Sequence, residues 1–193
     1  MNYILLGAAG FLLMHLLDFA SMKKVPLVKP ALALSGTSLV AFSVTMVATH
    51  GERFGLPLWL TVIGWVLMAV SLYLMARALY VTLPFGKTYL EPGVSGQLVT
   101  GGLYCLVRHP WLLFFTMSMI GLTLGSRSVL ALEAGLIWTA VSTSLVYFQD
   151  RMVFPKMFPG YAEYRQRTPM FLPNRQSLSA FIEGLNQNKV SEV

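Results

Sequence analysis

Between Leu56 and Leu79 the chain reads LPLWLTVIGWVLMAVSLYLMARAL, and Arg77 is the one charged residue of this stretch. About 20 consecutive apolar residues are enough for a helix to cross the hydrocarbon core of a bilayer. The stretch therefore predicts a transmembrane helix. The whole chain has the same bias, because 55% of its 193 residues are hydrophobic, 11% are charged and the mean hydropathy is +0.64. A water-soluble fold cannot bury that much apolar surface, so an all-α integral membrane protein is expected.

Four further apolar stretches lie on either side of this one. The five predicted spans cover residues 3–20, 31–49, 56–79, 103–124 and 129–148. The first span has no basic residue in front of it, which favours a retained helix over a cleaved signal. We expect one membrane-embedded domain over residues 1–173 and a polar tail over 174–193. In that tail Leu178, Phe181, Ile182 and Leu185 have helical spacing, which predicts a short surface helix.

The basic residues predict the orientation of the chain, because lysine and arginine are enriched in cytoplasmic connections. Five spans place two of them, Arg53 and Arg127, on one side of the membrane. The other twelve share the opposite side: Lys23, Lys24, Lys29, Arg77, Lys87, Arg108, Arg151, Lys156, Arg165, Arg167, Arg175 and Lys189. The N-terminus is therefore expected outside and the C-terminus in the cytoplasm, with a bacterial inner membrane favoured over the endoplasmic reticulum. Anionic headgroups account for the charge of +6, so no nucleic-acid partner is expected.

Two polar segments, residues 83–110 and 150–173, fall on the cytoplasmic side. Proline is favoured at the first position of a helix, so the fourth hydrophobic helix is expected to begin at Pro110. Such a helix is too short for the roughly 30 Å hydrocarbon core, and its start would lie below the headgroups. Arg108 and His109 would lie at that depth, which makes them candidate site residues. The alternative is that Arg108 extends to the lipid phosphates.

Residues 97–110 read QLVTGGLYCLVRHP. With Gly121, this pattern resembles the LVxxGxYxxxRHP signature of the membrane methyltransferases related to isoprenylcysteine carboxyl methyltransferase and phospholipid N-methyltransferase. In that family an acidic residue after the last span is followed by a phenylalanine, tyrosines and a closing proline motif. After the last predicted span, this chain contains Asp150, Phe158, Tyr161, Tyr164 and the sequence TPMFLP over 168–173.

The resemblance implies S-adenosylmethionine as cofactor, bound between the last helices and the cytoplasmic tail, and no metal. Arg108, His109 and Asp150 are the implied catalytic residues. The implied cofactor-binding residues are Leu98, Val99, Gly102, Tyr104, Arg108, His109, Pro110, Gly121, Asp150, Tyr161 and Tyr164. Arg108 suits the carboxylate of the cofactor, and Asp150 suits its ammonium and ribose hydroxyls. Tyr104 suits the sulfonium, whereas His109 suits either a hydrogen bond to the cofactor or a base.

The methyl acceptor is expected to enter from the bilayer as a lipid or other amphiphile. An isoprenylcysteine carboxylate, a lipid headgroup amine and a thiol all stay open. Two alternatives to this function are an NADPH-dependent enzyme similar to the sterol reductases and a non-catalytic membrane protein of the same fold. The second draws on departures from the family pattern, namely Leu112 in place of a tyrosine, Asp150-Arg151 in place of two glutamates, and a changed turn at 158–160. His15 and Asp18, inside the first span, are expected to pair or to line the acceptor cavity.

Overall fold

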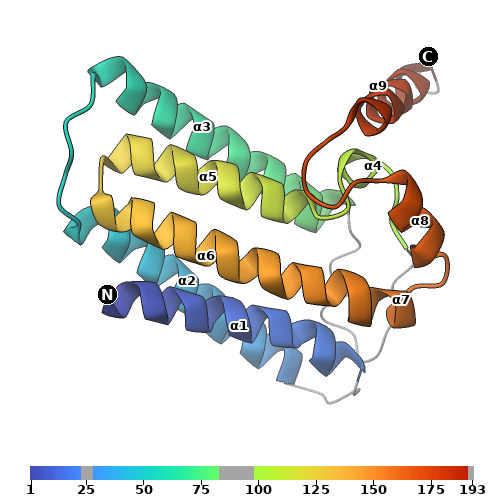
Figure 1. Cartoon of the computed structure of the whole chain (residues 1–193), viewed down its shortest axis with the longest axis horizontal. Coiled ribbons are helices and arrows are strands. Elements are labelled where there is room, and N and C mark those ends of the chain that lie inside the picture. Colours follow the sequence, from blue (N-terminus) through green and yellow to red (C-terminus); the bar gives the residue numbers. More distant parts are fainter. Residues whose placement is uncertain (23–27, 83–97, 191–193) are drawn as a thin grey trace.

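The computed structural model describes residues 1–22, 28–82 and 98–190, of which 18, 19, 21, 22 and 186–190 are described by their backbone alone. Long helices run side by side in this part of the chain (Figure 1): α1 (Asn2–Met22), α2 (Val28–His50), α3 (Leu58–Ala76), α5 (Pro110–Ser126) and α6 (Val129–Phe148). The described residues form no strand, apart from an isolated bridge between Arg53 and Ser128. The prediction of an all-α membrane protein is confirmed.

Three helical segments of the described residues are long and apolar enough to cross a membrane, over Val28–His50, Leu58–Thr82 and Val129–Met157. The second includes a π-helical continuation, η1 (Arg77–Thr82), and the third includes η3 (Gln149–Val153) and α7 (Phe154–Met157). Two shorter apolar helices cover Asn2–Leu17 and Pro110–Ser126. The five predicted spans therefore correspond to five apolar helices, of which three have the full spanning length.

The fourth apolar stretch, predicted over 103–124, does not form one continuous helix. The structure divides it into α4 (Leu103–Leu106) and α5, with Val107 in an extended conformation between them. The backbone N–H groups of Arg108 and His109 donate to the carbonyls of Pro169 and Met170, at 2.9 and 3.2 Å, instead of to a preceding helical turn. Pro110 is the first residue of α5, as predicted, because its missing N–H is not needed there.

Small residues set the closest helix contacts. A Cβ added to Gly121 in α5 would lie 2.6 Å from the backbone nitrogen of Met68, and one added to Gly64 in α3 would lie 2.5 Å from that of Gly125. The glycines therefore let the backbones of α3 and α5 approach closely, which is how helices associate where lipid offers no hydrophobic driving force. In the same bundle α1 packs along α2, and α6 contacts α1, α2 and α5, whereas α2 and α3 have almost no direct contact.

The two ends of the bundle differ in composition. At one end lie the N-terminus and two connections that are joined by hydrogen bonds from Phe54 N to Arg127 O (2.9 Å) and from Val129 N to Glu52 O (2.8 Å). At the other end lie α4, η3, α7, α8 (Tyr161–Arg167) and α9 (Arg175–Val190), as Figure 1 shows. Arg53 and Arg127 are thus at the opposite end from the basic residues of the tail, as the five-span plan predicts. Lys23, Lys24 and Lys87 lie outside the described residues.

Candidate active site

Asp150 is the centre of a buried polar cluster at the tail end of the bundle. Its carboxylate accepts a two-pronged pair of hydrogen bonds from Arg108, Nε to Oδ1 at 2.8 Å and Nη2 to Oδ2 at 2.9 Å. Tyr161 donates its hydroxyl to Oδ1 at 2.6 Å, and His109 Nε2 lies 3.1 Å from the same oxygen. Asp150 is only 1% exposed. We call Arg108, His109, Asp150 and Tyr161 the Asp150 cluster.

The guanidinium of Arg108 joins three segments of the chain. Besides the two bonds to Asp150, Nη1 donates to the carbonyls of Arg165 at 3.1 Å and Thr168 at 2.5 Å. These hydrogen bonds occupy four of the five N–H donors of an arginine. Arg108 therefore binds Asp150 and the end of α8, instead of presenting an open fork to a ligand carboxylate. The resemblance suggested that Arg108 binds the carboxylate of the cofactor and that Asp150 binds its ammonium, whereas in the structure these two side chains bind each other.

His109 and the tyrosines carry no charge at neutral pH. Burial lowers the pKa of His109 below its ordinary value of 6.5, although the carboxylate of Asp150 acts to raise it. A neutral His109 that donates Nε2–H to Asp150 has Nδ1 as its acceptor atom. The His109 ring stacks on Phe154, with centroids 5.7 Å apart. Burial raises the pKa of Tyr161 and Tyr164, so both phenols stay protonated.

Tyr164 and Tyr104 connect α8 to α4. The hydroxyl of Tyr164 donates to the backbone carbonyl of Tyr104 at 2.5 Å, and the hydroxyl of Tyr104 donates to the carbonyl of Ala78 in η1 at 3.4 Å. Tyr161 and Tyr164 are 3% and 7% exposed. The aromatic residues of the tail thus build the interior of the site, and the rings of Tyr161 and Tyr164 pack edge to face with centroids 5.8 Å apart.

A cavity of about 390 Å³ opens beside the Asp150 cluster. Seven residues implied by the resemblance line it: Leu98, Val99, Tyr104, Arg108, His109, Tyr161 and Tyr164. The rest of its wall is mostly apolar and comes in part from α1, α2, α3 and η1, including Phe11, Val40, Met75 and Leu79. The cavity therefore has a polar end at the cluster and an apolar end between helices.

Four implied residues do not line the cavity. Asp150 lies behind the lining residues that it holds, and Pro110 is buried as the first residue of α5. Gly102 precedes α4 with φ of +58°, a left-handed conformation that favours glycine. Gly121 lies against α3, where the contact with the backbone of Met68 leaves no room for a side chain. For Gly102, Pro110 and Gly121 the structure therefore shows a backbone reason for the residue type, and their contact with a cofactor stays a prediction.

The departures from the family pattern have local explanations. Leu112 is fully buried in the apolar core, among residues such as Phe115 and Trp138, and does not face the cavity. Arg151 is exposed and lies over the ring of Tyr147 at 5.3 Å, so it does not compete with Arg108 for Asp150. The changed turn ends at Gly160, which has a φ of +81° and directly precedes α8. Tyr161 is therefore the first residue of α8. None of these differences breaks the Asp150 cluster.

Sequence reasoning missed Gln149 and Phe154 as site residues and left His15 open. His15 lines the cavity, is 8% exposed, and forms a side-chain hydrogen bond with Gln149. Its ring lies 5.5 Å from that of Trp111. The signal for His15 was an ionisable residue inside an apolar span, whereas nothing in the sequence points to Gln149 or Phe154. The side chain of Asp18 lies outside the described residues, so its predicted pairing with His15 stays a prediction.

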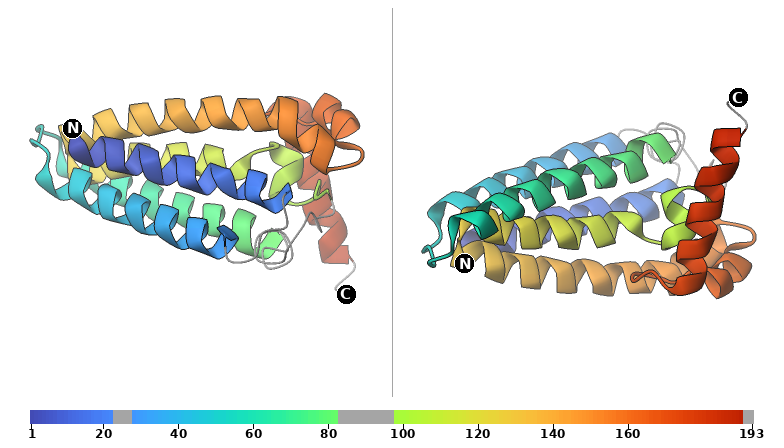
Figure 2. Two further views of the ribbon diagram at one scale, coloured as in Figure 1. Left: turned by 90° about the horizontal axis from the view of Figure 1, so that it is seen from below. Right: turned by 90° about the horizontal axis from the view of Figure 1, so that it is seen from above.

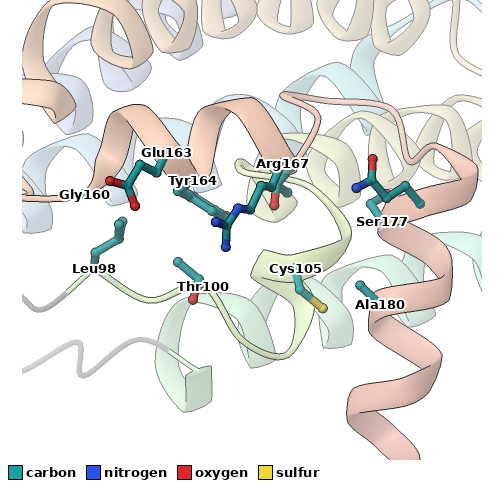
Figure 3. A pocket seen from close by; sticks show the side chains of 11 residues that line it. Leu98, Thr100, Cys105, Gly160, Glu163, Tyr164, Arg167, Ser177 and Ala180 are labelled. Carbon is teal, nitrogen blue, oxygen red and sulfur yellow. The ribbon is translucent and has the colours of Figure 1, made fainter.

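A second pocket, of about 490 Å³, lies between α4, α8 and α9 (Figure 3). Its wall includes the polar side chains of Thr100, Glu163 and Arg167, with Gln176 and Ser177 contributed by α9. Figure 3 shows the side chain of Arg167 reaching toward the middle of this pocket. Leu98 and Tyr164 line both this pocket and the cavity at the Asp150 cluster, so the two spaces are neighbours.

Comparisons with known proteins support the picture of a membrane enzyme. The family model described as phospholipid methyltransferase matches residues 59–159, more than half of the 193-residue chain. The cobalt-zinc-cadmium resistance protein CzcN of Cupriavidus metallidurans is 36% identical over 90 residues, which are 44% of this chain and 39% of that protein. The nickel-cobalt-cadmium resistance protein NccN of Alcaligenes xylosoxydans xylosoxydans is 32% identical over 90 residues, with 44% and 40% covered. The chain thus matches about two fifths of these relatives, and no solved structure matches it.

Proposed function

The chain belongs to the phospholipid methyltransferase family, and on this basis we propose that it transfers a methyl group from S-adenosylmethionine to an amphiphilic acceptor in the membrane. The observation that carries this proposal is the cavity with two chemical ends. Its polar end is lined by Arg108, His109 and Tyr161 of the Asp150 cluster and by the aromatic rings of Tyr104 and Phe154, and its apolar end by α1, α2 and α3. One polar and one apolar reactant fit such a space.

The residues at the polar end suit this cofactor. A sulfonium is a cation, and the ring faces of Tyr104, Phe154 and Tyr161 in the cavity wall can stabilise a cation. The volume of about 390 Å³ lies within the range of small-molecule sites. When bound, the cofactor would supply an activated methyl group. The protein would then mainly align the acceptor with that group and exclude water, for which a buried aromatic wall is suited.

We assign the Arg108–Asp150 pair a positioning role. Because Arg108 also binds the carbonyls of Arg165 and Thr168, the pair holds the start of α5 against α8. That contact keeps Tyr104 and His109 in the cavity wall. Neutral His109 has Nδ1 as a proton acceptor, which an amine or thiol acceptor needs and a carboxylate acceptor does not.

The acceptor is proposed to reach the cavity from the bilayer between α2 and α3. These helices have almost no direct contact, yet both line the cavity, α2 through Ala33, Thr37 and Val40 and α3 through Met75 and Ala76. An acyl or prenyl chain would lie along this apolar wall. The basic residues of the tail favour a cytoplasmic position for this end, with the N-terminus outside and a bacterial inner membrane as the location.

The test is cofactor binding by calorimetry with detergent-purified protein, using S-adenosylmethionine and NADPH. We expect S-adenosylmethionine to bind, and Asp150→Asn to weaken binding roughly 10- to 100-fold, because a buried charged hydrogen-bond partner is lost. Arg151→Gln is the matched control, since the neighbouring Arg151 side chain is exposed and points to Tyr147. Stronger binding of NADPH than of S-adenosylmethionine would favour a reductase function. Binding of neither cofactor would favour a non-catalytic role.

The acceptor class is tested separately by transfer of a labelled methyl group. Three probes distinguish the candidates: phosphatidylethanolamine vesicles for an amine, N-acetyl-S-farnesylcysteine for a carboxylate, and dodecanethiol for a thiol. We expect His109→Gln to abolish transfer to the amine or the thiol and to spare transfer to the carboxylate. Equal loss with all three probes would show that His109 acts on the cofactor and not on the acceptor.

A further inference from the structure

The C-terminal helix α9 is separate from the bundle. Figure 2 shows it crossing the tail end of the bundle at a steep angle to the long helices. Among the described elements, α4 is the one that it packs against closely. Its start is fixed by Asn174 and Ser177, through Ser177 N to Asn174 Oδ1 at 2.8 Å and Asn174 N to Ser177 Oγ at 3.1 Å. The rest of α9 extends beyond this attachment.

One side of α9 is apolar and uncovered. Leu178, Ile182 and Leu185 are 48%, 50% and 49% exposed, and their spacing of four and three residues places them on one face of a helix. Glu183 lies on another face and hydrogen-bonds to Ser179. At 16 residues α9 is about 24 Å long, and it is too polar and too short to cross a hydrocarbon core of roughly 30 Å. A helix with this pattern is suited to lie in the plane of a membrane surface.

The exposed charge at this end of the bundle suits an anionic surface. Exposed basic residues of the described tail outnumber exposed acidic ones; they are Arg151, Lys156, Arg167 and Arg175, against Glu163 and Glu183. Arg175 is the first residue of α9 itself. Basic residues beside an amphipathic helix strengthen its attraction to anionic lipid headgroups. The apolar outer surface of the bundle already requires lipid, so the headgroup layer is the surface that α9 meets at this end.

We propose that α9 is an interfacial helix that inserts Leu178, Ile182 and Leu185 into an anionic lipid surface. The opposite side of the helix contributes Gln176, Ser177 and Ala180 to the pocket of Figure 3. Lipid contact thus fixes one wall of a pocket that adjoins the candidate active site through Leu98 and Tyr164. The proposal does not depend on the reaction, because it requires only that the bundle lies in a membrane.

The test uses the full chain with a single cysteine that carries an environment-sensitive fluorophore. Cys105, the one native cysteine, is replaced by serine, and a cysteine is introduced as Ile182→Cys on the apolar face or as Glu183→Cys on the polar face. The protein is reconstituted in vesicles of phosphatidylcholine with or without phosphatidylglycerol, with nitroxide-labelled lipids as quenchers. We expect at least twofold stronger quenching at 182 than at 183, and stronger quenching at 182 when phosphatidylglycerol is present.

Equal quenching at the two positions would overturn the proposal. If quenching at 182 is the same with and without phosphatidylglycerol, the preference of α9 for an anionic surface is overturned. A second copy of the chain is the competing occupant of this face. In that case the fluorescence at 182 would depend on protein concentration in detergent and would resist lipid quenchers, which would also overturn the proposal.

Discussion

The Asp150 cluster and the crossing of α3 with α5 are both tightly packed, but different forces hold them. In the cluster, three side chains donate hydrogen bonds to one buried carboxylate. At the crossing, Gly64 and Gly121 allow two backbones to meet directly. A buried charge depends on each of its partners, whereas a shape contact depends on volume alone. The site end of the protein should therefore be sensitive to chemical changes that preserve shape, and the crossing only to changes of size.

The largest effect is expected from removal of the central carboxylate. Asp150→Ala leaves the buried guanidinium of Arg108 without its partner, and breaking a buried pair in this way costs about 3–5 kcal/mol. Chemical unfolding in detergent measures the change. Arg151→Ala is the control, and we expect it to change the free energy of unfolding by less than about 0.5 kcal/mol. A loss below about 1 kcal/mol for Asp150→Ala would mean that the pair does not hold the tail.

Tyr161→Phe changes chemistry with almost no change of shape. It removes the 2.6 Å hydrogen bond to Asp150, and a hydrogen bond to a charged group contributes about 1.5–3 kcal/mol. We expect a loss of this size in unfolding experiments, together with weaker cofactor binding. Tyr147→Phe is the matched control, because Tyr147 is exposed on α6. Equal free energies of unfolding for the two variants would mean that the Asp150 cluster is not sensitive to the loss of a single hydrogen bond.

Gly121→Ala changes size without changing polarity. The new Cβ would lie 2.6 Å from the backbone nitrogen of Met68, so α3 and α5 must move apart, at a cost of about 1–3 kcal/mol for overpacking. Gly55→Ala is the control, since nothing lies within 4 Å of a Cβ at Gly55. Thermal unfolding compares the two. The expected result is a destabilised Gly121 variant that still binds the cofactor, because Gly121 does not line the cavity.

The smallest effect is a pH dependence confined to the cluster. The pKa of His109 is lower in the folded state than its ordinary value of 6.5, so the unfolded chain binds the proton more tightly. Stability from His109 is therefore present above pH 6.5 and is lost as the pH falls from 6.5 toward the folded-state pKa, by at most about 1.4 kcal/mol per pH unit. Unfolding curves between pH 8 and about pH 5 measure this slope. His109→Gln should flatten it, and an unchanged slope would assign the titration to another group.

Much of the bundle could be predicted from the sequence. Apolar stretches of spanning length are a strong local signal, and the predicted span 129–148 coincides with α6. The start of α5 at Pro110 also followed from a local rule about proline. The separation of α4 from α5 did not, because it depends on hydrogen bonds from Arg108 and His109 to residues about 60 positions away.

The site was predictable as a set of residues but not as a set of contacts. The resemblance selected Arg108, His109, Asp150 and Tyr161, and the structure brings these four together. Their partners are decided by folding, which places α8 against the start of α5. The sequence therefore suggested Arg108 and Asp150 as separate ligand contacts, whereas in the structure they bind each other.

The sequence by itself determined that this protein lies in a lipid bilayer, how many long apolar helices it has, and at which end of the chain its polar residues gather. These properties follow from composition and local spacing, because the cost of placing polar groups in lipid acts on each segment separately. Only the tertiary structure decided which buried groups pair, that Gly121 serves helix packing, and that a cavity lies between α1, α2, α3 and the Asp150 cluster. Pairing and cavity shape depend on residues far apart in the chain, and no local pattern encodes their distance.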